Sequence, residues 1–196
     1  VALAQRKLKR LLAYSSIGQV GYLTLGLVAL TPASGVALVF HLVGYAFTTL
    51  AVFMVVVAVE NRTGGEEVGS LAGLSDRAPL AAMVMAAALF SLAGLPLFAG
   101  FVTKFYLFTA AAEAGFLWLA GLAIANSVVS LYYYLNIIRQ MYIEPPADGS
   151  PLPVPPLAVA VLLLTFAGTI LIGVYPGPLV ELVQAANGSL TPHMAP

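Results

Sequence analysis

A lysine, a histidine and a tyrosine lie inside the most apolar stretches of this chain, and each of these side chains can carry or pass a proton. Lys104 belongs to SLAGLPLFAGFVTKF, residues 91–105, and His41 and Tyr45 belong to another apolar run. A charged lysine near the centre of a bilayer costs about 2.5 to 3.5 kcal/mol unless it has a partner or water, or gives up its proton. Such a lysine can gain and lose a proton near neutral pH, as a proton relay requires.

His41 and Tyr45 could extend such a relay. At the rise of a helix, His41 lies on the order of 10 Å into its run, at a depth comparable with Lys104, so the two could share a cavity. Tyr45 follows one turn later on the same face, where an imidazole and a phenol can pass hydrogen bonds along. Two alternatives stay open. Lys104 could snorkel to the nearby surface that Glu113 marks, and His41 could be an ordinary hydrogen-bond partner between helices.

The residues just before Lys104 predict that its helix is interrupted. Gly94, Pro96 and Gly100 all lie in the same apolar run. Pro96 has no N–H to donate, and it disfavours the helical conformation for Leu95 before it. Because backbone groups freed at membrane depth must be satisfied by protein or by a water-filled cavity, we expect the break to face inward.

The composition is that of a membrane protein. Of the 196 residues, 61% are hydrophobic and 8% are charged, and the formal net charge is zero. This balance leaves no basic excess for nucleic acid. The absence of cysteine excludes thiolate-held iron–sulfur clusters and disulfides, and two distant histidines predict no metal site. The start at Val1, without an initiator Met or a signal-peptide pattern, suggests a fragment that lacks an N-terminal part.

Five segments are long and apolar enough to span a bilayer, which predicts an all-α integral membrane protein. The third of these transmembrane helices is expected to be broken at Gly94–Pro96. Residues 1–178 form one five-helix domain, and 179–196 form a short tail. The predicted spans are about 11–30, 36–59, 80–112, 116–138 and 157–175.

The basic residues predict the orientation, because Lys and Arg are retained on the cytoplasmic side of membrane helices. All but Lys104 fall on the end of the bundle where the chain starts, so the N-terminal end is expected to be cytoplasmic and the C-terminus to lie on the opposite side. Those residues are Arg6, Lys7, Lys9, Arg10, Arg62, Arg77 and Arg139.

Polar side chains dot the first and fourth predicted spans and could line a wet path. For any one of them the alternative is stronger, since Ser and Gln often join helices and tyrosines often form an interfacial belt. The candidates are Ser16, Gln19, Ser127, Ser130 and Tyr133.

Three stretches together resemble the antiporter-like membrane subunits of respiratory complex I, the proton-translocating NADH:quinone oxidoreductase. They are LKRLLAYSSIGQVGYLTLGL, SLAGLPLFAGFVTKFYLF and NSVVSLYYYLNIIRQMY, and the resemblance runs from Leu8 to about Pro178. In that family each subunit contains two inverted five-helix repeats, each with a broken helix. The chain resembles the C-terminal repeat.

The choice among the subunit types of that family depends on three positions. Lysine at Lys104 resembles the L-type and N-type subunits, whereas the M-type has glutamate there. The L-type has a histidine where this chain has Tyr45 and a lysine where it has Thr49, and it carries a long lateral helix after its last span. The resemblance is therefore closest to the N-type, and it weakens the transfer of an L-type histidine relay to His41.

For function, the resemblance implies that Lys104 is the terminal lysine of a hydrophilic axis that translocates protons, coupled to quinone reduction elsewhere. The chain itself would carry no redox centre; FMN and iron–sulfur clusters would belong to other subunits of the complex. It would lie among the other membrane-arm subunits in a bacterial plasma membrane. Two alternatives remain: a subunit of a multi-subunit cation/proton antiporter, and a structural scaffold in which Lys104 pairs with a neighbour's carboxylate.

Overall fold

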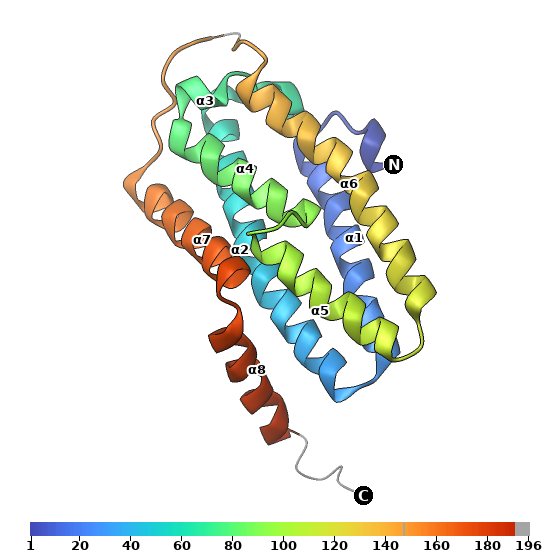
Figure 1. Ribbon diagram of the computed structural model, residues 1–196. Coiled ribbons are helices and arrows are strands. Elements are labelled where there is room, and N and C mark those ends of the chain that lie inside the picture. The colour runs from blue at the N-terminus through green and yellow to red at the C-terminus, as the bar shows by residue number, and fades with distance from the viewer. Residues whose placement is uncertain (147, 191–196) are drawn as a thin grey trace, which may run out of the picture.

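The computed structural model describes residues 1–146 and 148–190, which form helices joined by short loops (Figure 1). Two short 3-10 turns lie at Ala2–Ala4 and Val68–Leu71. The α-helices are α1 (Leu8–Ala29), α2 (Pro32–Thr63), α3 (Leu74–Arg77), α4 (Pro79–Ala93), α5 (Ala99–Glu113), α6 (Leu117–Tyr142), α7 (Pro156–Val174) and α8 (Gly177–Leu190).

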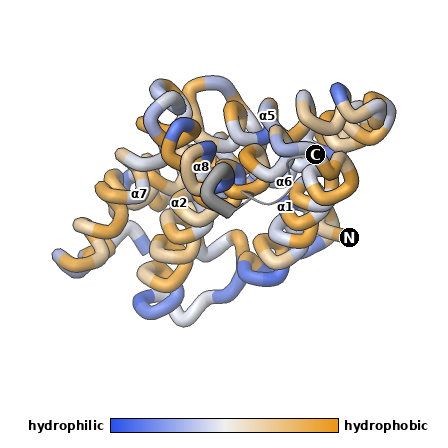
Figure 2. Tube along the Cα trace, turned by 90° about the horizontal axis from the view of Figure 1, so that it is seen from below, coloured by the Kyte–Doolittle hydropathy of each residue, from blue (hydrophilic) through white to orange (hydrophobic). Residues whose placement is uncertain are grey.

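Four of these helices, α1, α2, α6 and α7, are long and apolar enough to cross a membrane. The chain is therefore an all-helical, multi-pass membrane protein. Figure 2 shows that hydrophobic residues are frequent along its helices. The segment predicted as a third span, 80–112, is not one helix: α4 and α5 have 15 residues each. Because a helix needs about 20 residues to span a bilayer, neither meets that length alone.

Local sequence signals explain where α2 begins and ends. Thr31 and Ser34 form a reciprocal capping box at its start, with Pro32 in the first turn, where its missing N–H costs nothing. The helix ends at Thr63, and Gly64 after it has a φ of 65°, a left-handed conformation that glycine adopts without strain.

Helix α2 is the centre of the bundle and packs against α1, α4, α5, α7 and α8. Figure 1 shows α4 and α5 end to end along it, so the interruption between them lies at mid-height. Eleven of the fifteen residues of α4 are buried, many of them alanines. A helix that is apolar all round is expected to be enclosed, and its small side chains let neighbouring helices approach closely.

The N-terminal segment is fastened to the loop after α2. Lys7 pairs with Glu66 at 2.8 Å and Lys9 with Glu60 at 2.7 Å, and the Leu8 N–H donates to the Glu66 carbonyl oxygen. Lys7 holds the pKa of the Glu66 carboxyl below its usual value through this hydrogen bond. Such exposed ion pairs contribute little stability singly, so they chiefly align this basic end of the bundle.

The stretch predicted as a tail, 179–196, is helical in its described part. Helix α8 extends to Leu190, while residues 191–196, including His193, lie outside the described residues. Val180 and Val183 are buried against the first turns of α2 and the end of α7. The apolar spacing of Leu179, Val180 and Val183 suits an amphipathic helix, and this was the signal available in the sequence.

Candidate functional site

The interruption ahead of Lys104 lies where the sequence predicts it. Helix α4 ends at Ala93, Gly94 follows with a φ of 85°, and α5 starts at Ala99 after Pro96. Gly100 was expected in the interruption as well, but it is the second residue of α5. A Cβ at Gly100 would overlap the carbonyl oxygen of Ser91, so this glycine serves the close contact between the two helix ends.

Leu97, inside the interruption, has a φ of 76°, which is strained for a residue with a Cβ, and its side chain is exposed. We expect Leu97→Gly to stabilise the protein by about 1 kcal/mol, because relief of the strain exceeds the added entropy of the unfolded chain. Thermal unfolding of the full-length protein in detergent measures this. Leu157→Gly, at an exposed position inside the first turn of α7, should lower the stability instead; a lower unfolding temperature for Leu97→Gly would contradict the assignment of strain.

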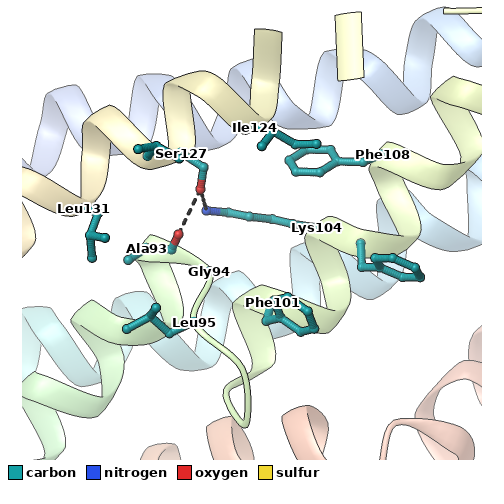
Figure 3. A pocket seen from close by; sticks show the side chains of 11 residues that line it. Ala93, Gly94, Leu95, Phe101, Lys104, Phe108, Ile124, Ser127 and Leu131 are labelled. Carbon is teal, nitrogen blue, oxygen red and sulfur yellow. Dashed lines mark hydrogen bonds between the residues drawn. The ribbon is translucent and has the colours of Figure 1, made fainter. Parts of the chain in front are cut away.

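The Lys104 side chain is only 3% exposed and turns toward the end of α4 (Figure 3). Its Nζ donates to the Leu92 carbonyl oxygen at 2.6 Å and to Ser127 Oγ at 3.0 Å. It also lies 4.7 Å from the centroid of the Tyr22 ring, close enough for a cation–π interaction. The ammonium therefore has internal partners and does not snorkel to the surface.

The end of α4 supplies these acceptors because a helix leaves its last carbonyls without partners in the helix. The Leu92 carbonyl oxygen accepts from Lys104 and also from Gln19 Nε2 at 3.4 Å. Ser127 accepts from Lys104 and donates to the Ala93 carbonyl oxygen at 2.9 Å. The negative end of the α4 dipole also points at the ammonium. Among the described residues, no Asp or Glu forms an ion pair with Lys104.

A cavity of about 330 Å³ opens beside Lys104, between the interruption and α6. Figure 3 shows its wall of apolar side chains, with Lys104 and Ser127 as the polar side chains that reach it. His41 does not line this cavity. Thr103, the residue before Lys104, contacts His41 instead.

His41 is 2% exposed, and its Nδ1 lies 3.0 Å from Thr103 Oγ1, while its Nε2 is buried without a hydrogen-bond partner. The Tyr45 ring stacks on the imidazole, with ring centroids 6.4 Å apart. The Tyr45 hydroxyl donates to Ser16 Oγ at 2.8 Å. Thr103, His41, Tyr45 and Ser16 thus form a polar row from α5 across α2 to α1.

The remaining predicted path residues have different surroundings. Gln19 and Ser127 both reach the end of α4, as described above. Ser130 donates to the Asn126 carbonyl oxygen of its own helix, and Tyr133 packs edge-on against Tyr134 at 4.5 Å between centroids. Neither Ser130 nor Tyr133 bonds to Lys104.

Several residues of the site were not predicted from the sequence. Thr103 joins His41 to α5, Tyr134 bonds to Ser15, and Thr48 bonds to Ser91. Thr48 follows His41 by two helical turns, so a shared helix face could have singled it out. Among the described residues, no group of three histidine or carboxylate side chains could hold a metal ion.

Comparison with known proteins identifies the family. Residues 1–130 match the model of the family described as NADH:quinone oxidoreductase/Mrp antiporter, transmembrane. The chain belongs to this family. Membership confirms the resemblance to the antiporter-like subunits.

Three similar proteins show how far the similarity extends. NADH-quinone oxidoreductase subunit N of Desulforamulus reducens is 45% identical over 189 residues, 96% of this chain and 40% of that protein. A chain of the archaeal membrane-bound sulfane sulfur reductase superposes with a TM-score of 0.88 and is 36% identical, over 96% of this chain and 38% of its own length. A chain of the Mrp complex from Dietzia sp. DQ12-45-1b superposes with a TM-score of 0.86 and is 27% identical, over 97% of this chain and 44% of its own length. The chain spans about two fifths of the length of these relatives.

Proposed function

We propose that this chain is the C-terminal part of a proton-translocating membrane subunit of an NADH:quinone oxidoreductase, of the subunit N type. The observation that carries the proposal is the buried Lys104 ammonium, which the end of an interrupted helix holds. The 45% identity to a subunit N supports the choice of complex.

Lys104 would take up and release the translocated proton. Its partners are a carbonyl oxygen, a hydroxyl and an aromatic ring, so only neutral groups of the described chain stabilise its charged form. Because electrostatic energies are large in a medium of low dielectric constant, a modest change in the field of neighbouring subunits would decide whether the proton stays. Quinone reduction elsewhere in the complex would supply that change.

The polar rows on either side of Lys104 would lead the proton toward the two membrane faces. His41, Tyr45 and Ser16 would form one branch, through Thr103. Gln19 and Ser127 would line the approach to Lys104, with Ser130 and Tyr133 further along α6. The chain would bind no redox cofactor; FMN and iron–sulfur clusters would be carried by partner subunits.

The proposed topology has five spans, with α4 and α5 crossing together as one broken span. The interruption is tolerable at that depth because protein groups satisfy the freed carbonyls. The basic N-terminal end would face the cytoplasm and α8 the opposite side of a bacterial plasma membrane. In this topology residues 1–178 form the membrane domain, packed against other membrane-arm subunits.

The second candidate is a subunit of a multi-subunit cation/proton antiporter, which the TM-score of 0.86 to a chain of the Mrp complex favours. Purification of the complex that contains the full-length protein tests the two. The proposed function predicts co-purified flavin and iron–sulfur signals and proton uptake by vesicles on addition of NADH. A complex that lacks these cofactors and exchanges protons for cations would establish the antiporter instead.

A further inference from the structure

A chain of hydrogen bonds joins helices α2, α4 and α5 next to the interruption. The Gly100 N–H, in the first turn of α5, donates to Ser91 Oγ at 2.9 Å. Ser91 Oγ lies 3.1 Å from Thr48 Oγ1, and Thr48 donates to the Gly44 carbonyl oxygen at 2.8 Å. The Ser91 and Thr48 side chains are almost completely buried, so this chain of bonds is closed to solvent.

The direction of each bond follows from the number of protons available. A hydroxyl has one proton to donate, and the Thr48 proton goes to the Gly44 carbonyl oxygen. The Ser91 hydroxyl must therefore donate to Thr48, which leaves its lone pairs to accept from Gly100. Every donor in the chain is used once, and the arrangement has one orientation.

Ser91 thereby caps a helix to which it does not belong. The first N–H groups of a helix have no partner within it, and Phe98, which precedes α5, has no side-chain acceptor to offer. Serines inside helices otherwise tend to bond back to a carbonyl of their own preceding turn. The bond to Thr48 directs the Ser91 hydroxyl across to α5 instead.

The cap also sets the place of the lysine. Lys104 follows Gly100 by four residues, so it lies one turn further along the same face of α5. Leu92, whose carbonyl oxygen accepts from Lys104 Nζ, is the residue next to Ser91. The last turn of α4 therefore holds both the start of α5 and the ammonium at the end of the lysine side chain.

We infer that Ser91 and Thr48 are positioning residues for Lys104: by fixing the start of α5 against the end of α4, they keep Lys104 Nζ in reach of the Leu92 carbonyl oxygen and Ser127. This inference rests on the proposed function. Neither hydroxyl exchanges the transported proton, since neither is hydrogen-bonded to Lys104. They act on Lys104 only by holding the helices that carry it and its acceptors.

The test measures redox-driven proton uptake by vesicles that carry the assembled complex with the full-length protein. Thr48→Val keeps the shape of the side chain and removes the hydroxyl; we expect uptake to fall about fivefold, the effect of one lost hydrogen bond. Thr48→Ser restores the hydroxyl and should restore uptake. Ser91→Ala should lower uptake similarly, and the double variant should be no worse than Ser91→Ala alone, because both residues serve one chain of bonds.

Thr165→Val is the matched control, because the buried Thr165 hydroxyl bonds only to carbonyls of its own helix α7. It should leave uptake near that of the unaltered complex. Uptake in Thr48→Val equal to that of Thr165→Val would overturn the inference. A loss of assembled complex that accounts for the loss of uptake would also overturn it, since the pair would then be a folding contact.

Lys104→Ala in the same vesicles separates this inference from the proposed function. If Lys104→Ala leaves uptake intact, the proposed function fails. If Lys104→Ala abolishes uptake while Thr48→Val and Ser91→Ala do not lower it, the positioning role alone is wrong.

Discussion

Redox-driven proton uptake is expected to fall about 100-fold or more when Lys104 is replaced by alanine. This is the lower limit of the rate that a side chain typically contributes when it transfers a proton. The neighbours of the ammonium cannot replace it, since the Ser127 hydroxyl, the Tyr22 phenol and the Leu92 carbonyl are not bases as an amine is. The measurement compares proton uptake with NADH oxidation in vesicles, after the amount of assembled complex has been equalised.

Two further variants separate the charge of Lys104 from its proton exchange. Lys104→Arg keeps a positive charge, but a guanidinium does not deprotonate in proteins, so uptake should remain lost. Lys9→Ala removes an exposed lysine at the basic end of the bundle and should leave uptake unchanged. Wild-type uptake in Lys104→Arg would show that the position needs only a charge. A scaffold role would instead lower assembly in Lys104→Ala more than turnover.

Gly100→Ala is expected to have the largest effect on stability, a loss of about 3 kcal/mol. The added Cβ would overlap the backbone carbonyl of Ser91, which cannot move aside as a flexible side chain could. Helix α5 would have to withdraw from α4, and both the Ser91 cap and the Lys104 contact would weaken. We expect the unfolding temperature of the full-length protein in detergent to fall by roughly 3 °C, because its relatives are about two and a half times as long as this chain.

Gly121→Ala is the control for this substitution. Gly121 lies in α6, and nothing comes within 4 Å of a Cβ built there. Alanine has the higher helix propensity, so this variant should unfold at the same or a slightly higher temperature. If both variants unfold alike, the close approach of α4 and α5 at Gly100 is wrong.

The interruption was predictable because its causes are local. Pro96 lacks an N–H whatever surrounds it, and Gly94 is free to adopt the left-handed conformation it shows. The lysine was equally conspicuous, because a charged residue inside a long apolar run is recognisable from residue order alone. Gly100 was assigned to the interruption for the same local reason, and wrongly so, because its role depends on how near Ser91 comes.

The contacts of the site were not predictable. The acceptor for Lys104 is a main-chain carbonyl, a group that every residue has, and it is free only because α4 stops at Ala93. Thr48 and Ser91 are small polar residues of a kind found throughout the chain, and their pairing requires α2 and α4 to cross at that height. Likewise, α8 is amphipathic by pattern, but its place against α2 came only from the packing.

The sequence by itself determined that this is a helical membrane protein, where one helix is interrupted, which charged residue lies inside an apolar run, and which family it resembles. Hydrophobic periodicity, proline geometry and the cost of a charge act along the chain, so they can be deduced from residue order. Only the tertiary structure decided that Lys104 turns inward, that the end of α4 receives it, and that His41 bonds to Thr103. Those outcomes depend on which groups two helix ends and their neighbours bring within hydrogen-bond distance, and residue order does not specify that distance.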